Sequence, residues 1–399
     1  MPASPIRKLV PYAEAAKQRG TQVYQLNIGQ PDVETPTAYW QAIENASPKV
    51  LAYSHSAGNP TLREAIVRYY SQVGHEVSSD EVIVTTGASE ALNFVFASCF
   101  NPGDEVIIPE PFYANYNGFS IASNVKVCPI PTRIEDDFAL PSIEAFEALI
   151  TPQTKAIMIC NPGNPTGILY RPEELAQLKE IVLKHDLFLI ADEVYREFVY
   201  DGHEHRSVLG LKGAEQHVIV TDSISKRFSA CGARIGCVVS RNAAVMDSVM
   251  KLAQARLSPP TLGQIGAEAV YALPPTFYQG VVEEYRQRRD VMLAALREMP
   301  GVVVPTVNGA FYAMVKLPVD HSEKFCQWML ESFSHDNRTL LMAPGAGFYS
   351  SPDQGQQEVR IAYVLNQTDL LKAMECLRLG LAEYPGRTVD VEGEVSTAQ

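Results

Sequence analysis

The amino-acid sequence predicts an α/β fold, in which a mostly parallel sheet with helices on both faces is joined to a smaller α+β domain. Three observations lead to this expectation. Between about residues 81 and 240, apolar runs of strand length alternate with helical segments, which is the order of βαβ units. These runs are nearly continuous, as strands of a sheet covered on both faces require. After residue 240 the alternation stops.

The elements of the first part follow from these patterns in chain order. Residues 5–19 form an amphipathic helical segment, residues 23–27 a short strand, and residues 60–73 a second helix. The helices expected between the strands of the sheet are residues 89–100, 112–123 and 172–186. The strands expected in the sheet are residues 81–86, 104–110, 155–160, 187–194, 217–224 and 234–240.

The C-terminal part has the pattern of an α+β unit. A long helical stretch, residues 276–299, is followed by three strand-like runs with helices between and after them. We therefore expect an N-terminal segment (residues 1–50) that joins the small domain, a large domain (51–289) and a small C-terminal domain (290–399). The acidic tail from about residue 388 is expected to be disordered. The three strand-like runs are residues 309–317, 339–345 and 359–365, and the helices are residues 322–333 and 368–384.

Charge and cysteine usage limit the partners. The 33 basic and 46 acidic residues give a formal net charge of −13, whereas nucleic acids and anionic membranes require a basic face, so we expect neither partner. The seven cysteines form no CxxC pair, which indicates neither a disulfide framework nor a zinc site, and we expect no metal. Because the sequence has no signal peptide and no run of about 18 apolar residues, we expect a soluble, cytoplasmic protein.

The most informative stretch, residues 221–236, carries a lysine at the end of a predicted strand. Lys226 follows Ser223 and Ser225, and Arg234 lies eight residues further on. Ligands bind at the carboxyl ends of strands in α/β sheets, and the two serines with the arginine can hold a phosphate. A lysine beside a phosphate site is the arrangement expected of a Schiff base with pyridoxal phosphate. A solvated lysine in a surface turn is the alternative.

A carboxylate follows another predicted strand. Asp192 ends an apolar run, and Tyr195 lies three residues further on. A buried aspartate needs a partner, and the pyridinium nitrogen of pyridoxal phosphate supplies one, because an ionised carboxylate keeps that nitrogen protonated. Tyr195 can donate a hydrogen bond to the phenolic oxygen of the same cofactor. The alternative is an aspartate that caps the next helix.

Two turns complete the pattern. The stretch NPGNPTG is a turn by composition, and Asn164 can present its amide to the phenolic oxygen, held by a cis bond to Pro165. The stretch TTGASEAL lies between a predicted strand and helix, where backbone N–H groups form an anion site. The alternative for NPGNPTG is a plain loop, and the alternative for TTGASEAL is an ordinary helix start. The N–H groups of this second turn belong to Gly87, Ala88 and Ser89.

Together these four stretches resemble the class I/II aminotransferases, the aspartate aminotransferase superfamily of pyridoxal phosphate enzymes. The glycine-containing turn, NPGNPTG, ADEVY and SISK with its arginine occur in the family's order, and the resemblance covers nearly the whole chain. It implies a large cofactor domain with a mostly parallel seven-stranded-type sheet, and a homodimer with shared active sites. It also implies transamination between an α-amino acid and a 2-oxo acid in two ping-pong half-reactions.

The resemblance implies roles for single residues. Lys226 would form the internal aldimine and move a proton, and Asp192 would pair with the pyridine nitrogen. Tyr195 is the third residue implied in catalysis. Tyr113 matches the aromatic residue that stacks on the cofactor ring, and Tyr53 matches a tyrosine that reaches the partner's phosphate across a dimer interface. The other residues implied in cofactor binding are Gly87, Ala88, Ser89, Asn164, Ser223, Ser225 and Arg234.

Substrate contacts are implied as well. Arg360 matches the arginine that holds the substrate α-carboxylate in a bidentate fork, near Asn164, and Gly29 matches a glycine whose backbone approaches the same carboxylate. Some aspartate-type members bind the side-chain (distal) carboxylate of the substrate with a lysine in the phosphate-binding turn. This chain has Ser89 at that position. Arg256, donated across the dimer, is the candidate for that role here.

The resemblance favours an aspartate-like donor with 2-oxoglutarate as acceptor, and leaves other activities open. An aromatic- or alanine-type aminotransferase has the same cofactor residues. A pyridoxal phosphate lyase or decarboxylase on the same fold would also share them. A regulator that uses such a domain to sense effectors would carry an additional DNA-binding domain, for which we find no candidate segment in this acidic chain.

Overall fold

The computed structural model describes residues 6–389 of the chain. Within this range a central sheet of seven strands has the order β2-β8-β7-β6-β5-β3-β4, and all neighbours are parallel except those of β8, which is antiparallel to β2 and to β7. The expected α/β fold with a mostly parallel sheet is confirmed. The strands are β2 (Val82–Thr85), β3 (Glu105–Glu110), β4 (Lys126–Pro131), β5 (Thr154–Cys160), β6 (Phe188–Asp192), β7 (Val218–Ser223) and β8 (Gly236–Val239).

Helices cover both faces of this sheet, because successive residues of each strand point to opposite sides. In β3, for example, Val106 and Ile108 pack in one buried cluster and Ile107 in the other. The first face is covered by α4 (Gly87–Cys99), α5 (Asn115–Ala122) and α9 (Ala243–Arg256). The second face is covered by α3 (Pro60–Gln72), α6 (Ile143–Glu147), α7 (Pro172–His185) and α10 (Thr261–Tyr271).

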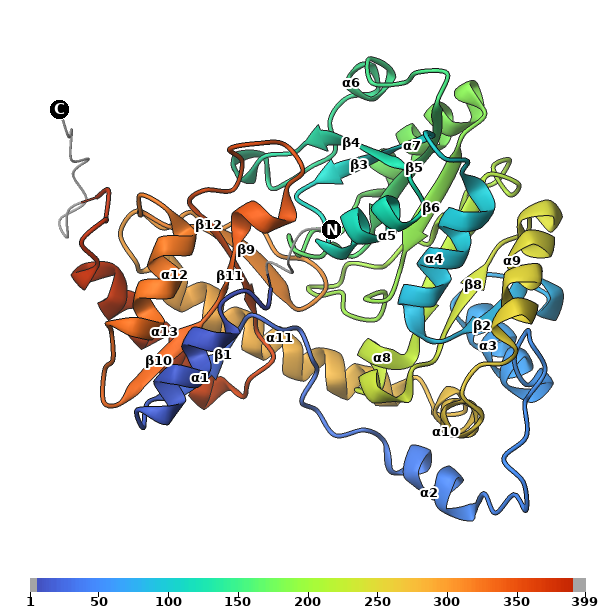
Figure 1. Ribbon diagram of the computed structural model, residues 1–399, viewed down its shortest axis with the longest axis horizontal. Helices are drawn as coiled ribbons and strands as arrows, with labels where there is room; N and C mark the ends of the chain where they lie inside the picture. The colour runs from blue at the N-terminus through green and yellow to red at the C-terminus, as the bar shows by residue number, and fades with distance from the viewer. Residues whose placement is uncertain (1–5, 390–399) are drawn as a thin grey trace.

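A second group of elements lies beside the sheet (Figure 1). The antiparallel strands β9 (Tyr312–Lys316), β12 (Glu358–Ala362) and β11 (Ala343–Pro344) form one small sheet. Strand β1 (Gln22–Gln25) pairs in parallel with β10 (Arg338–Leu341), far away in the sequence. The helices here are α1 (Val10–Gln18), α12 (Ser322–Glu331), α13 (Gln367–Glu383) and the long α11 (Thr276–Arg297), which runs toward α8 (Ile224–Arg227) of the large part.

The N-terminal segment therefore divides between the two parts. Helix α1 packs against α12 and β1 against β10, whereas α2 (Thr37–Asn45) packs against α10 of the large part. The domain limits at residues 50 and 289 stay predictions. The acidic tail expected from about residue 388 lies, from residue 390 on, outside the described residues. The short 3-10 helices are η1 (Ser79–Glu81), η2 (Ile134–Asp136), η3 (Val208–Gly210), η4 (Cys231–Ala233) and η5 (Gly345–Phe348).

In the described part of the chain, no helix is both long and apolar enough to cross a membrane.

Candidate active site

A cavity of about 380 Å³ opens at the carboxyl edge of the central sheet. Asp192 ends β6 and Ser223 ends β7, and both line the cavity. The turn after β5 contributes Asn164, and the start of α4 contributes Ala88. Parallel strands bring their carboxyl ends to one edge, which is where α/β sheets bind ligands.

The structure brings most of the predicted site residues together here. Three predicted residues, Gly87, Tyr53 and Arg256, do not line the cavity. Gly87 lies directly against the guanidinium of Arg234. The predicted residues that line the cavity are Gly29, Ala88, Ser89, Tyr113, Asn164, Asp192, Tyr195, Ser223, Ser225, Lys226, Arg234 and Arg360.

Lys226 reaches into the cavity from the one-turn helix α8. Ser223 caps the N-terminus of this helix, and its hydroxyl accepts a hydrogen bond from the backbone N–H of Ser225 (3.2 Å). The Lys226 Nζ donates to the backbone oxygen of Gly29 at 2.9 Å and lies 3.9 Å from the sulfur of Cys231. Because none of these contacts is to a carboxylate, the amine is held by neutral groups and is available for chemistry in the cavity.

Asp192 is a buried carboxylate, with only 4% of its surface exposed. Its Oδ2 accepts a hydrogen bond from the hydroxyl of Tyr116 (2.8 Å), and its Oδ1 accepts one from the backbone N–H of Val194 (3.4 Å). Burial raises the pKa of Asp192 to about 6, whereas the positive charge of Lys226 lowers this pKa by a smaller amount. In the described residues Asp192 has no ion-pair partner, so a cationic N–H group in the cavity would match it.

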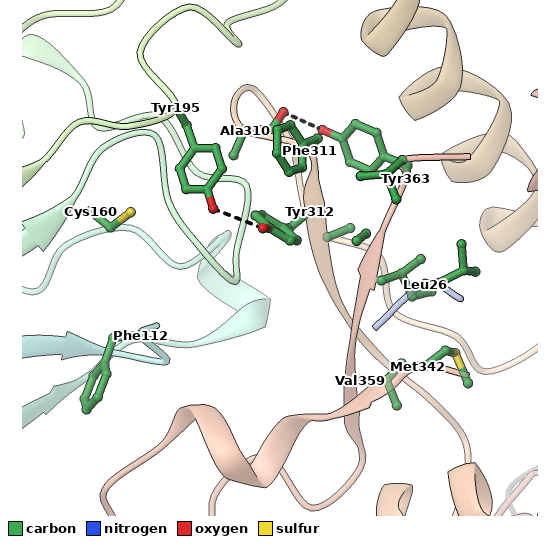
Figure 2. Packing of buried hydrophobic residues seen from close by; sticks show 14 of the residues in the cluster. Leu26, Phe112, Cys160, Tyr195, Ala310, Phe311, Tyr312, Met342, Val359 and Tyr363 are labelled. Atoms are coloured by element: carbon green, nitrogen blue, oxygen red, sulfur yellow. Dashed lines mark hydrogen bonds between the residues drawn. The ribbon is translucent and has the colours of Figure 1, made fainter. Parts of the chain in front are cut away.

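A chain of hydrogen bonds links the two parts of the molecule across the cavity. The Asn164 amide donates to the hydroxyl of Tyr195 (3.4 Å), and Arg360 Nη1 donates to the Asn164 side-chain oxygen (2.9 Å). Figure 2 shows Tyr195 and Tyr312 with their hydroxyls facing one another, 3.0 Å apart. These contacts orient the Asn164 amide and the Tyr195 hydroxyl together. The predicted cis bond between Asn164 and Pro165 is confirmed.

Arg360 is 1% exposed, yet it has no carboxylate partner among the described residues. It lies on β12, and its guanidinium carbon is 4.5 Å from the ring centroid of Tyr312 and 4.8 Å from that of Phe348. Its Nη2 donates to the backbone oxygen of Asn27, and its Nε has no hydrogen-bond partner. Burial lowers the pKa of Arg360. A buried guanidinium that lacks an anion is suited to bind a substrate carboxylate in a bidentate fork.

The other end of the cavity has the features of an anion site. Helix α4 begins at Gly87, and Ala88 and Ser89 of its first turn line the cavity, so the positive end of the helix dipole lies at the cavity wall. Gly87 has φ +73°, and a Cβ built on it would lie 2.3 Å from Nη2 of Arg234. The exposed Arg234 therefore packs directly on the turn. Ser223 and Ser225 line the same end.

This close packing predicts the effect of a methyl group. Gly87→Ala places a side chain at a positive φ and displaces Arg234, so we expect the dissociation constant for pyridoxal phosphate to rise about tenfold or more. Spectroscopic titration of the cofactor-free protein measures this constant. Gly232→Ala, two residues before Arg234 and with open space around its Cβ, is the matched control and should bind as the wild type does. Equal affinity of the Gly87 variant would contradict the prediction.

Tyr53 and Arg256 lie away from the cavity of the single chain. The Tyr53 side chain is 78% exposed. Arg256 forms an ion pair with Glu90 (2.7 Å) and donates to the backbone oxygen of Ser56 (3.0 Å). Glu90 in turn accepts from the backbone N–H of Thr86 at the start of α4 (2.7 Å). The roles expected for Tyr53 and Arg256 across a dimer stay predictions.

Several residues at this site were not singled out from the sequence. Tyr116 holds Asp192, Tyr312 holds Tyr195, and Cys231 and Arg7 line the cavity. Tyr116 and Tyr312 lie in apolar stretches that are typical of core, so no local signal marks them. In the described part of the chain, no three His, Cys, Asp or Glu side chains are grouped to hold a metal ion.

Comparison with known proteins decides the family. Residues 21–377 match the family model described as aminotransferase class I and II. The chain belongs to this family. It is 32% identical over 386 residues to an aspartate aminotransferase of Pyrococcus horikoshii, covering 95% of this chain and 94% of that protein. It is also 32% identical over 381 residues to an arginine–pyruvate transaminase of Pseudomonas aeruginosa, covering 94% of each.

Solved aminotransferase structures share the fold. The Thermus thermophilus aspartate aminotransferase with maleate superposes with a TM-score of 0.86 at 28% identity, covering 96% of this chain and 97% of that one. An alanine aminotransferase from Pyrococcus furiosus gives a TM-score of 0.87 at 30% identity, covering 94% and 96%. The chain is an aminotransferase of the aspartate aminotransferase family, whose members use pyridoxal phosphate.

The residues of the cavity fit this cofactor. A buried carboxylate that lacks a cationic partner suits the pyridinium nitrogen. The missing Cβ at Gly87 lets the Arg234 guanidinium lie against the start of α4, where a cation beside backbone N–H groups suits a phosphate. Lys226 lines the same cavity, and its Nζ has neutral contacts only. Tyr195 and Asn164 together present the groups that a phenolic oxygen requires.

Proposed function

We propose that this aminotransferase moves the amino group of an α-amino acid, with an aspartate-like donor favoured, to a 2-oxo acid such as 2-oxoglutarate. One observation carries the proposal: Lys226, the carboxylate of Asp192 and the buried guanidinium of Arg360 all line the same cavity. The first supplies an amine, the second a partner for a cationic ring nitrogen, and the third a site for a carboxylate. Two further cavities, one beside Met158 and Tyr170 and one beside Thr151 and His185, do not combine these groups.

The residues divide into those that hold the cofactor and those that act on the substrate. Asp192 holds the ring nitrogen, and Tyr195 with Asn164 holds the phenolic oxygen. The phenol of Tyr113 lies over the cavity, and its hydroxyl accepts a hydrogen bond from Asn115 (2.7 Å), which orients the ring. The residues proposed to bind the phosphate are Gly87, Ala88, Ser89, Ser223, Ser225 and Arg234.

Pyridoxal phosphate, when bound, supplies a carbonyl carbon for the donor nitrogen and a ring that delocalises the electrons left at the donor α-carbon. Lys226 would act as the base: its Nζ would take the proton from the donor α-carbon and return it to the cofactor carbon that carries the donor nitrogen. Ionised Asp192 keeps the ring nitrogen protonated, which makes the ring a better electron acceptor. Arg360 fixes the α-carboxylate, with Gly29 beside it, so that the α-hydrogen faces Lys226.

We propose further that the active unit is a homodimer in the cytoplasm. Trp40, Val50, Leu51 and Tyr53 are exposed apolar or aromatic side chains of one segment, and such a concentration of exposed apolar groups supports an interface there. Tyr53 and Arg256 would then complete the site of the partner subunit. The seven cysteines, all free thiols in the structure, suit a reducing compartment.

A half-reaction tests the proposed function. The cofactor-loaded protein is mixed with single amino acids in the absence of any 2-oxo acid, and the absorption spectrum and the products are followed. We expect aspartate or glutamate to convert the cofactor to its amine form with one equivalent of 2-oxo acid per site. Release of ammonia or carbon dioxide, without the amine form, would replace the proposal by a lyase or a decarboxylase.

A further inference from the structure

Lys226 lies on a turn that its own backbone holds weakly. Helix α8 has only four residues, Ile224–Arg227, and its main backbone hydrogen bond runs from the N–H of Phe228 to the oxygen of Ile224 (3.2 Å). A single helical turn is unstable by itself, because several residues must be ordered for one hydrogen bond. The position of Lys226 therefore depends on contacts between this turn and the rest of the fold.

A buried ion pair encloses the turn. Asp222, near the end of β7, and Arg227, the last residue of α8, flank it in the sequence, and Nη2 of Arg227 donates to both carboxylate oxygens of Asp222 (2.6 Å to Oδ1). Of the four residues between them, Ser223, Ser225 and Lys226 line the cavity. Successive strand residues point to opposite sides, so the pair joins the two ends of the turn on the side away from the cavity.

This chain alone encloses the pair. The hydroxyl of Tyr70 on α3 donates to Oδ2 of Asp222 (3.3 Å). The guanidinium carbon of Arg227 lies 4.4 Å from the ring centroid of Tyr69, also on α3, and 6.0 Å from that of Tyr271 on α10. Both side chains of the pair are 0% exposed. A partner subunit therefore cannot contact either of them, and their effect does not depend on how the site is shared in a dimer.

Stability alone is a weak explanation for this ion pair. Two buried charges lose about as much free energy by desolvation as their attraction returns, and apolar replacements of such pairs are often neutral. Nε and Nη1 of Arg227 also lack a hydrogen-bond partner, which adds to the cost. A charged hydrogen bond fixes the relative position of its two groups more narrowly than an apolar contact does. The fixed geometry is therefore the benefit that we assign to this pair.

The charge of the pair also reaches the cavity. Burial is the main cause that raises the pKa of Asp192, and the negative charge of Asp222 raises this pKa further. Arg227 lies against Asp222, so its positive charge offsets that effect. Without Arg227, the unbalanced carboxylate would favour the protonated form of basic and acidic groups in the cavity.

We propose that Arg227 is a positioning residue for Lys226, because its ion pair with Asp222 closes the turn and keeps Nζ directed at the reacting atoms in the cavity. This inference rests on the proposed function. Proton transfer requires close alignment of Nζ with the donor α-carbon, so a small displacement of the turn slows the reaction. Binding of the donor through Arg360 does not depend on the turn.

Half-reaction kinetics of Arg227→Met test the proposal. We expect kcat to fall by about 10- to 100-fold, while KM for the donor stays within about twofold of the wild type. Arg227→Lys keeps a charged donor without the planar guanidinium, so it should recover part of the loss.

Arg289→Met is the matched control, because Arg289 is also buried (5% exposed) and donates two hydrogen bonds to an aspartate, Asp201 (2.7 and 2.9 Å). Its guanidinium carbon likewise lies over a tyrosine ring, that of Tyr200, at 4.8 Å. Arg289 lies outside the turn, so its loss should lower the thermal stability but leave kcat and KM unchanged.

The double variant Asp222→Asn/Arg227→Met separates geometry from charge. It removes both buried charges together, which a protein tolerates better than the loss of one, so it also serves as the test if Arg227→Met does not fold. We expect kcat to stay low, because the link is still missing. The pH midpoint of the absorption band of the lysine-bound cofactor should rise in Arg227→Met and return toward the wild-type value in the double variant.

A measurement without turnover separates this inference from the function on which it rests. Pyridoxal phosphate is added to the cofactor-free protein, and the rate at which the absorption band of the lysine-bound form appears is followed. This rate requires a well-placed Nζ but no donor amino acid. We expect it to fall about tenfold in Arg227→Met and in the double variant, and to stay unchanged in Arg289→Met.

Three results would overturn the role of Arg227. The first is a kcat and an attachment rate within twofold of the wild type in Arg227→Met. The second is recovery of both quantities in the double variant, which would assign the loss to the unbalanced charge of Asp222. The third is an equal loss in Arg289→Met, which would indicate general destabilisation. Absence of transamination with every donor would instead remove the proposed function, and the attachment rate would still decide the role of Arg227.

Discussion

Replacement of Lys226 by alanine is expected to lower transamination by at least about 10⁴-fold, because the change removes both the amine that attaches the cofactor and the base that moves the α-proton. Steady-state assays with saturating cofactor measure the loss. The absorption band of the lysine-bound cofactor should disappear in the same variant.

The fold should tolerate this change. The Lys226 side chain donates to one backbone oxygen, that of Gly29, and takes part in no ion pair within residues 6–389. Thermal unfolding of the cofactor-free variant should therefore match that of the wild type. Lys251→Ala, which removes an exposed lysine that pairs with Asp247, is the control and should keep full activity. Wild-type turnover in Lys226→Ala would exclude the proposed mechanism.

Asp192→Asn is expected to have the second-largest effect. Asparagine keeps an oxygen for the Tyr116 hydroxyl but loses the charge that stabilises a protonated ring nitrogen, so kcat should fall by about 10²- to 10³-fold. KM for the donor should change much less, because Asp192 and Arg360 act on different groups. Single-turnover kinetics of the half-reaction measure the effect. A kcat within twofold of the wild type would exclude the proposed pairing.

The same substitution should change how stability depends on pH. Burial raises the pKa of Asp192 to about 6, above the value of about 3.9 for an unfolded aspartate. Between these values the native state binds more protons than the unfolded state, so the free energy of unfolding that Asp192 contributes falls as pH rises. The fall amounts to about 3 kcal/mol between about pH 4 and pH 7.

Urea unfolding of the two cofactor-free proteins measures this dependence. Asparagine does not titrate, so the stability of Asp192→Asn relative to wild type should increase as pH rises through this window and become constant above it. A difference that stays constant from about pH 4 to pH 7 would show that Asp192 has an ordinary pKa in the folded protein.

The sequence predicted the strands that are buried on both faces, because their apolar runs are nearly continuous. It did not predict β4, an edge strand whose residues are partly exposed and include Pro129 and Pro131. The sequence also predicted that residues 339–345 form one strand. The structure divides this stretch between β10, which pairs with β1, and β11, which pairs with β12. Strand pairing between distant segments leaves no local pattern, so neither this division nor the antiparallel direction of β8 could be derived.

The candidate site was predictable where function imposes a local motif. Lys226, Asp192 and Asn164 each lie in a short stretch at the end of a strand, so topology alone brings them together. Tyr116 and Tyr312 act through contacts made by tertiary structure, and their neighbours in sequence resemble ordinary core. Arg360 was predicted from the resemblance to the family, and its burial in a strand without an anionic partner agrees with that prediction.

The order of strands in the central sheet has a consequence during synthesis. Strand β2 is the first of the seven in sequence, but its neighbour β8 is the last, and roughly 150 residues separate them. At about 5–20 residues per second, the ribosome needs about 8 to 30 s to make that stretch. Throughout this time the four residues of β2, all buried in the finished protein, have no strand to pair with. The growing chain therefore presents an apolar, unpaired strand to the cell, and chaperones that act at the ribosome meet this segment long before the active site exists.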